Sequence, residues 1–223
     1  MLLGIRLIIY DLDGVLIDSN PAIRESIIHS LLQYNLQYDI EEIMKQMGTP
    51  LIKIFEETFN EKDQNKIPYV LQEYKKYYME TGKNQLTLHS NVIETLSYFS
   101  ENGITQCIAS NSSRDLMEPI LAELGVMSFI KHFVGLGDVK QPKPDPMILE
   151  YIMKKINVEK HETVFIDDSS TGLTAGKEAE VHTVGIATGV HTTSQILSVD
   201  PEFILTNISQ LKEIIKVESS ASV

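Results

Sequence analysis

The chain has 223 residues, of which 43% are hydrophobic and 22% charged, as in a globular protein of one large domain or one domain with an insert. The formal net charge of -12 disfavours a nucleic-acid partner, because binding to a phosphate backbone requires a basic surface. The apolar start of the chain, 1–14, is too short to span a bilayer and lacks the features of a signal peptide, so we expect no membrane partner. The single cysteine, Cys107, excludes a disulfide within the chain and indicates a buried thiol in a cytoplasmic protein.

The first predicted element is a short buried strand over 7–10, which ends abruptly in Asp11-Leu12-Asp13-Gly14. Residues two apart point to the same side of a strand, so the carboxylates of Asp11 and Asp13 can converge on one small volume. Two carboxylates this close repel each other unless a cation lies between them or one of them is protonated. The stretch therefore indicates a metal site, an acid/base role or both, with simple turn chemistry as the alternative.

The segment after this stretch is predicted to be helical. Asn20-Pro21 is a signal for the start of a helix, and Ile23, Ile27 and Leu31 then recur at helical spacing. Further helices are predicted over 40–47, 51–59 and 63–79. We therefore expect an all-helical cap domain over 20–86, inserted directly after the first strand.

From residue 89 onward, strands alternate with helices. The predicted strands cover 104–109, 131–134, 163–166, 181–186 and 203–205. The predicted helices cover 91–101, 113–124, 146–156, 171–180 and 208–216. This alternation is typical of a parallel sheet with helices on both faces, so we expect a Rossmann-like α/β core domain formed by 1–19 and 87–223. The small polar residues at 218–223 are expected to fray.

The place of the helical insert in the chain bears on its function. Because the insert follows the first strand, it should lie above the carboxyl ends of the strands, where open α/β sheets bind ligands. A group of helices there can act as a lid over a site. The alternative is that these helices simply pack against the side of the core.

Three further groups of polar residues follow predicted strands. Ser110-Asn111 can bind phosphate oxygens through its hydroxyl and nearby backbone N–H groups, although it would also serve as an ordinary helix cap. Lys143 lies between two prolines, so a stiff loop can aim its ammonium at a phosphate, with a solvated turn as the alternative. Asp167-Asp168 ends another strand, and paired acids there call for a cation such as Mg2+.

Together these motifs resemble those of the haloacid dehalogenase superfamily. The run DLDGVLIDS at 11–19 resembles motif I, DxDG(T/V)xxDS. Ser110-Asn111 is similar to motif II, Lys143 lies in a sequence similar to the KPxP form of motif III, and DDSSTGLTAGKEAE at 167–180 resembles motif IV. The resemblance covers 7–186 and is closest to the subfamily with a helical cap after motif I, which includes phosphoglycolate phosphatase and β-phosphoglucomutase.

The resemblance implies a Mg2+-dependent phosphatase that forms an aspartyl-phosphate. In this reading Asp11 is the nucleophile, and Asp13 is the general acid and base. The implied ligands of Mg2+ are Asp11, the backbone carbonyl of Asp13, Asp168 and, after it, Asp167. The implied phosphate-binding residues are Ser110, Asn111 and Lys143.

The implied substrate is a small phosphorylated metabolite similar to phosphoglycolate, bound by a monomer or homodimer. Gly48-Thr49-Pro50 resembles the GxP loop in the caps of phosphoglycolate phosphatase-like enzymes, although a plain turn fits equally well. Ile23 stands where β-phosphoglucomutase has a histidine, which disfavours that isomerase. The second acid of motif I and the metal pair disfavour a metal-free dehalogenase, and a non-catalytic phosphate-binding protein is a further alternative.

Overall fold

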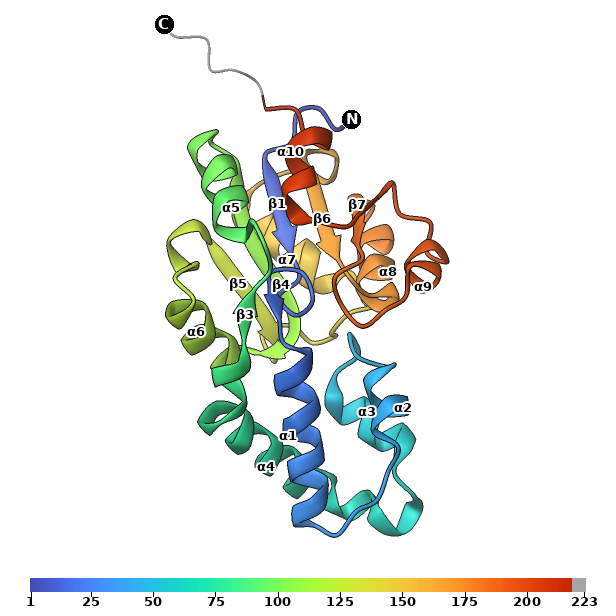
Figure 1. Ribbon diagram of the computed structural model, residues 1–223. Coiled ribbons are helices and arrows are strands. Elements are labelled where there is room, and N and C mark those ends of the chain that lie inside the picture. The colour runs from blue at the N-terminus through green and yellow to red at the C-terminus, as the bar shows by residue number, and fades with distance from the viewer. Residues whose placement is uncertain (218–223) are drawn as a thin grey trace, which may run out of the picture.

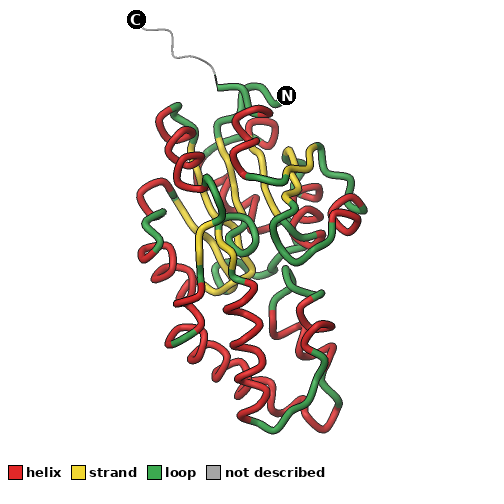
Figure 2. The backbone as a smooth tube through the Cα atoms, in the orientation of Figure 1, coloured by secondary structure: helices red, strands yellow, loops and turns green. Residues whose placement is uncertain are grey.

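The computed structural model describes residues 1–217, and the predicted frayed end at 218–223 lies outside these described residues. The strands are β1 (Leu7–Tyr10), β2 (Ile17–Asp18), β3 (Thr87–Leu88), β4 (Thr105–Ser113), β5 (His132–Leu136), β6 (Thr163–Asp167), β7 (His182–Ile186) and β8 (Phe203–Leu205). Six of them form one sheet in the order β5-β4-β1-β6-β7-β8, and neighbouring strands in it are parallel. Figure 2 shows these strands with helices around them. The predicted Rossmann-like α/β fold is confirmed.

Helices lie beside the sheet and beyond one of its ends. The α-helices are α1 (Asn20–Gln33), α2 (Ile40–Met44), α3 (Leu51–Thr58), α4 (Ile67–Glu80), α5 (Val92–Glu101), α6 (Arg114–Glu123), α7 (Met147–Ile156), α8 (Ser170–Glu178), α9 (Thr193–Leu197) and α10 (Leu211–Ile214). Figure 1 shows α1 to α4 beyond the end of the sheet toward which β1 and β6 point. Over the described residues, no helix combines the length and apolar character that crossing a membrane requires.

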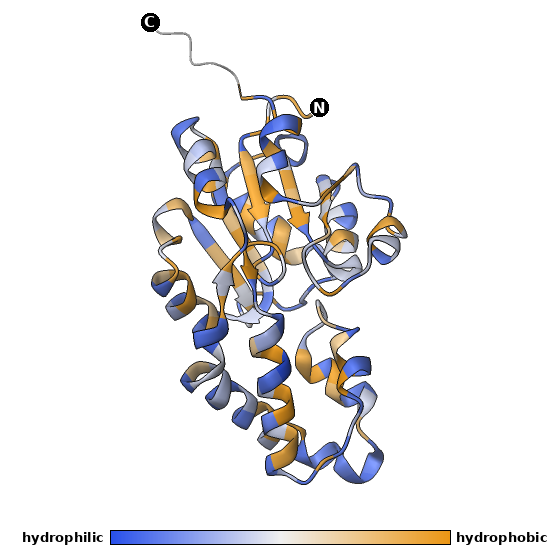
Figure 3. Cartoon of the chain, viewed as in Figure 1, coloured by the Kyte–Doolittle hydropathy of each residue, from blue (hydrophilic) through white to orange (hydrophobic). Residues whose placement is uncertain are grey.

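Strand β1 is central because both of its faces are covered by apolar layers. All four of its residues are buried, and Leu7 and Ile9 belong to a different hydrophobic cluster from Ile8 and Tyr10. Residues of α7 and α8 complete the first cluster, whereas residues of α5, α6 and α10 contribute to the second. Side chains of a strand alternate between its faces, so an apolar strand of this kind requires two covering layers. Figure 3 shows the hydrophobic residues concentrated in β1 and β6.

The register of β1 brings the ends of three strands together. Tyr10, the last residue of β1, pairs with Ile108 of β4 on one side and with Ile166 of β6 on the other. Strands β4 and β5 lie to one side of β1, and β6, β7 and β8 lie to the other. Open α/β sheets bind ligands where the strand order reverses in this way. The residues that follow Tyr10, Ile108 and Ile166 therefore meet at one place.

Helices α1 to α4 pack on one another, with α1 against α4 and α3 against α4. Their contacts bury apolar residues such as Ile27, Ile54 and Phe55. The chain enters and leaves this group through β2 and β3, which pair antiparallel with Ile17 opposite Leu88. The division of the chain into a core domain and a cap domain stays a prediction.

The secondary structure differs from the sequence-based prediction in several parts, among them the helix predicted over 208–216, which is a 3-10 helix, Ile208–Gln210, followed by α10. The helix predicted over 63–79 is a 3-10 helix, Glu61–Lys66, followed by α4, because Pro68 lacks an N–H and fits only the first turn of a helix. Strand β4 continues past its predicted end, because Ser113 pairs with Leu136 of β5 after an irregularity in the ladder. Strands β2 and β3 and helix α9 are too short for a periodic pattern to reveal them.

Candidate active site

A buried lysine between two carboxylates forms the centre of the site. Lys143 is only 1% exposed, and a lysine is almost never this buried without charged partners. Its Nζ lies 3.0 Å from Oδ1 of Asp11 and 2.7 Å from Oδ2 of Asp167. Burial alone would lower the pKa of Lys143, but the two carboxylates raise it above its usual value, so the ammonium stays charged.

Asp168 adds a third carboxylate to this centre. Asp11, Asp167 and Asp168 are all buried, and each offers an oxygen within 4.8 Å of the others. The backbone approaches Asp168 closely, since a Cβ added at Gly14 or Gly189 would collide with its carboxylate. Gly14 also has a φ of +75°, a conformation that residues with a side chain rarely adopt. The turn after β1 therefore depends on a glycine for both its shape and the room it leaves for Asp168.

The cluster carries more negative charge than its lysine can neutralise. Burial is the main cause that raises the pKa of Asp11 to about 7, with Lys143 lowering it and Asp167 raising it further. Burial, followed by repulsion from Asp167 and Asp11, raises the pKa of Asp168 well above its usual value. When all are ionised, three carboxylates against one ammonium leave an excess of two negative charges. Mg2+ prefers carboxylate oxygens and supplies two positive charges, so these residues fit that ion.

Asp13 lies outside the three-carboxylate cluster and has a different partner. The hydroxyl of Ser112 donates a hydrogen bond of 2.9 Å to Oδ2 of Asp13. The N–H of Ser112 in turn donates to Oγ of Ser110 over 3.1 Å. Sequence reasoning missed Ser112, although its position two residues after Ser110 on an extended segment was an available signal.

Two core side chains hold the loop between α2 and α3. Nδ2 of Asn111 donates hydrogen bonds to the carbonyl of Gly48 over 2.8 Å and to the carbonyl of Lys143 over 3.0 Å. Nε2 of His191 lies 2.9 Å from the carbonyl oxygen of Met47, and its Nδ1 accepts from the first N–H of α8. His191 is buried, and no sequence motif pointed to it, because its role depends on a contact between distant segments.

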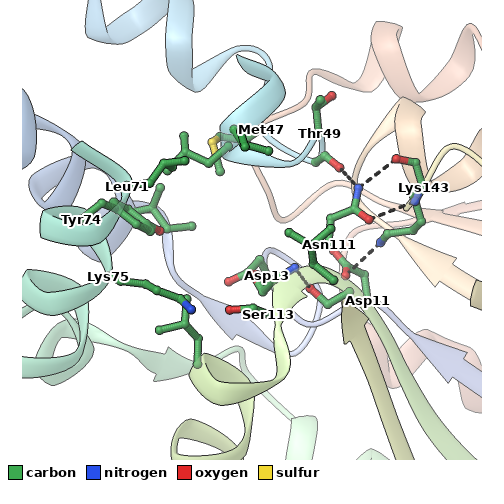
Figure 4. A pocket seen from close by; sticks show the side chains of 18 of the residues that line it. Asp11, Asp13, Met47, Thr49, Leu71, Tyr74, Lys75, Asn111, Ser113 and Lys143 are labelled. Carbon is green, nitrogen blue, oxygen red and sulfur yellow. Dashed lines mark hydrogen bonds and ion pairs between the residues drawn. The ribbon is translucent and has the colours of Figure 1, made fainter. Parts of the chain in front are cut away.

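A cavity of about 450 Å³ lies where the carboxylates face the helical group. Figure 4 shows Met47, Leu71 and Tyr74 on one side of it and Asp11, Asp13 and Asn111 on the other. The predicted site residues that line this cavity are Asp11, Asp13, Ser110, Asn111, Lys143 and Asp168. Asp167 is the exception, since it does not line the cavity, pairs with Lys143 and accepts hydrogen bonds from Ser169. The individual roles of these residues stay predictions.

Comparison with known proteins gives one family, and the relatives in it are named as pyrophosphatases and phosphoglycolate phosphatases. The family model of haloacid dehalogenase-like hydrolases matches residues 8–186. The pyrophosphatase PpaX of Oceanobacillus iheyensis is 29% identical over 96% of this chain and 98% of its own length. The phosphoglycolate phosphatase of Haemophilus influenzae is 27% identical over 94% of this chain and 98% of its own length. The predicted enzyme class, a phosphatase of this superfamily, is confirmed.

Solved structures agree on the fold. A crystal structure described as a predicted phosphoglycolate phosphatase of Haemophilus somnus superposes with a TM-score of 0.85. It covers 95% of this chain and 98% of its own, at 24% identity. With a family model that spans most of its residues, the chain belongs to the haloacid dehalogenase-like hydrolases.

Proposed function

We propose that this enzyme hydrolyses a small phosphomonoester in a Mg2+-dependent reaction through an aspartyl-phosphate on Asp11. The observation that carries the proposal is the position of Asp11. Its carboxylate lines the cavity, contacts the buried ammonium of Lys143 and belongs to a cluster of three carboxylates. A carboxylate held in this way is both oriented for attack and shielded from the charge of an approaching phosphate.

The reaction has two steps that balance in atoms and charge. In the first, a carboxylate oxygen of Asp11 forms a bond to phosphorus while the bond from phosphorus to the ester oxygen breaks. Asp13 gives its proton to the departing alkoxide, which leaves as an alcohol. In the second step, Asp13 takes a proton from water, the water oxygen bonds to phosphorus, and inorganic phosphate leaves Asp11.

The other residues act on charge and position. Lys143 stabilises negative charge on the phosphoryl group, and the hydroxyl of Ser110 offers it a hydrogen bond. Ser112 orients the carboxyl group of Asp13 toward the cavity. When bound, Mg2+ would neutralise charge between substrate and enzyme, and Asp11, Asp168 and the backbone carbonyl of Asp13 would hold it.

The structure bears on the rival activities as well. Ile23 lines the cavity and has no titratable group, so its place offers no substitute for the histidine of a phosphoglucomutase. A phosphoglycolate-like substrate, a monomeric or homodimeric state and a cap that opens and closes stay proposals. A cytoplasmic location also stays a proposal. The buried free thiol of Cys107 supports it, because a chain without a disulfide needs no oxidising compartment.

The test is hydrolysis of p-nitrophenyl phosphate with Mg2+, with EDTA and in the Asp11→Asn variant. We expect Mg2+-dependent release that both EDTA and the substitution abolish, while Asp200→Asn, at an exposed position, has wild-type activity. Release by Asp11→Asn at the wild-type rate would contradict the proposed nucleophile. No release by the wild type, with Mg2+ and phosphate still bound, would favour a non-catalytic binding protein.

A second measurement observes the intermediate directly. In Asp13→Asn the first step still proceeds with p-nitrophenyl phosphate, because p-nitrophenolate leaves without a proton. The second step slows, because no group takes the proton from water. We expect mass spectrometry after acid quench to find a phosphoryl group on the peptide that contains Asp11.

A further inference from the structure

The walls of the cavity beside Asp11 are the surfaces that a leaving group would meet. Its volume of about 450 Å³ falls within the range of small-molecule sites, roughly 300–1,000 Å³. The helical group contributes mainly apolar side chains to the lining, namely Ile23, Met47, Leu51, Ile52, Leu71 and Tyr74. The phenol of Tyr74 adds no charge, because burial and then the neighbouring Asp13 raise its pKa above its usual value.

The same lining offers little positive charge to a second negative group, although Asn20, Thr49 and Gln72 add neutral polar side chains. Among the described residues, the lysines that line the cavity are Lys143 and Lys75. Lys143 is buried against Asp11 and Asp167, where it can serve only the transferring phosphoryl group. Lys75 is exposed and already forms an ion pair of 2.6 Å with Asp115.

These observations set the polarity of the leaving group. A carboxylate, or a second phosphate, held against Leu71 and Tyr74 would lose its hydration without gaining an unpaired cation, which is costly. An alkyl or aryl group there would gain from leaving water. A two-carbon leaving group would also leave most of the cavity unfilled.

We infer that the enzyme acts on phosphomonoesters of an uncharged, largely apolar alcohol of medium size, whose carbon skeleton fills the cavity between Leu71 and Leu116. This inference rests on the proposed phosphatase function and specifies its substrate class. The exposure of two lining residues from different elements agrees with it. Ile52 of α3 is 41% exposed and Leu136 of β5 is 36% exposed, so a bound apolar group would cover both.

The experiment compares kcat/KM for methyl, butyl, hexyl and octyl phosphate with the values for phosphoglycolate and pyrophosphate. These alkyl groups leave with nearly equal intrinsic reactivity, so differences among them report binding of the chain. We expect kcat/KM to rise roughly two- to fourfold per methylene until the cavity is full. We expect kcat/KM for phosphoglycolate and for pyrophosphate to be at least tenfold lower than kcat/KM for hexyl phosphate.

Variants of residues in and outside the cavity lining test whether the lining causes the preference for longer alkyl phosphates. Leu71→Gln places a polar group in the lining, and we expect it to reduce the ratio of kcat/KM for hexyl over methyl phosphate at least fivefold. Leu32→Gln is the matched control, because Leu32 is 65% exposed on α1 and lies outside the lining, and its ratio should equal that of the wild type. Lys75→Met should leave the ratio unchanged or raise it.

Two results would overturn the inference, and they differ from a failure of the proposed function. Equal kcat/KM across the alkyl series would exclude an apolar subsite. A preference for phosphoglycolate or pyrophosphate that Lys75→Met removes would show that Lys75 binds a charged leaving group. In both cases Mg2+-dependent turnover persists and the phosphatase proposal stands, whereas no turnover of any ester, p-nitrophenyl phosphate included, would remove both.

Discussion

The side-chain amide of Asn111 donates a hydrogen bond of 2.8 Å to the backbone carbonyl of Gly48, which ties the end of β4 to the loop between α2 and α3. The same side chain accepts a hydrogen bond from the N–H of Lys143 and donates one to its carbonyl. Asn111 therefore connects the helical group to the loop that carries the buried lysine. These bonds occupy its side chain, so a direct bond to phosphate would require one of them to break.

Asn111→Ala should loosen this connection. The carbonyl of Gly48 loses a donor, and we expect a loss of about 1–2 kcal/mol of unfolding free energy with faster hydrogen exchange over 45–52. The kcat/KM should fall about tenfold, because the loop lines the cavity. Asn102→Ala is the control, since Asn102 donates to a backbone carbonyl at an exposed helix end. Unchanged exchange over 45–52 would show that His191 alone holds the loop.

Lys143→Met should be among the most destabilising single substitutions in the core of the site. It leaves Asp11 and Asp167 buried without their ammonium, and breaking a buried ion pair costs about 3–5 kcal/mol. We expect this loss in urea unfolding at pH 8 in EDTA, with a smaller loss at pH 5, where protonation relieves the repulsion. Lys131→Met, at an exposed position, should differ little from the wild type. An equal loss at both pH values would mean that packing, not charge, is responsible.

Asp11→Asn should stabilise the protein in EDTA while it abolishes activity. The pKa of Asp11 is raised to about 7, so between its ordinary value and pH 7 the folded state binds a proton that the unfolded state does not. The free energy of unfolding of the wild type therefore falls as pH rises through this range. The neutral amide in Asp11→Asn does not titrate, so the variant has no such loss. We expect Asp11→Asn to be more stable by about 2–4 kcal/mol at pH 8, with the gap closing toward pH 4.

Mg2+ should change the difference in stability between the wild type and Asp11→Asn, because the ion binds the ionised carboxylate of Asp11. For the wild type we expect Mg2+ affinity, measured by calorimetry, to rise with pH through about 7, where Asp11 loses its proton. Binding should release protons below pH 7, which the dependence of the binding enthalpy on buffer ionisation reports. An affinity independent of pH from 5 to 8 would contradict the raised pKa of Asp11.

Ser112→Ala should lower kcat more than it changes KM. Without the hydroxyl at 2.9 Å, the carboxyl group of Asp13 loses the contact that orients it for proton transfer. We expect the first step, measured in single turnovers, to slow about tenfold for alkyl phosphates and much less for p-nitrophenyl phosphate, whose leaving group needs no proton. Ser112→Thr keeps the hydroxyl and should recover most of the activity. Equal losses in the first step with both kinds of ester would assign Ser112 a role in phosphate binding instead.

The parts of this molecule that could be predicted are those in which local sequence and tertiary structure agree. The strand over 7–10 is apolar at every position and is followed by Asp11 and Asp13, so burial and chemistry are both visible in one short run. Lys143 could be predicted for the same reason, because prolines on both sides mark its loop.

The parts that could not be predicted depend on contacts between distant segments. His191 reaches Met47 across 144 positions, and no local pattern encodes that meeting. The pairing of β2 with β3 involves two residues from each strand, which is too few for alternation to show. The apolar lining of the cavity was also hidden, because Ile23, Leu71 and Leu136 belong to separate elements whose periodicity suggests only ordinary packing.

The pairing of Ile17 with Leu88 has a consequence for how this family can diversify. Because the chain departs from the sheet and returns to it at adjacent positions, the helices between them can be exchanged for others without altering the register of β1 or the ends of its neighbours. A graft of a foreign helical segment between these two strands would retain Asp11 and replace the part of the cavity lining that the helices supply. The helical part of the cavity lining and the residues that follow β1, β4 and β6 are thus encoded in separable stretches of the gene, and each can vary while the other is preserved.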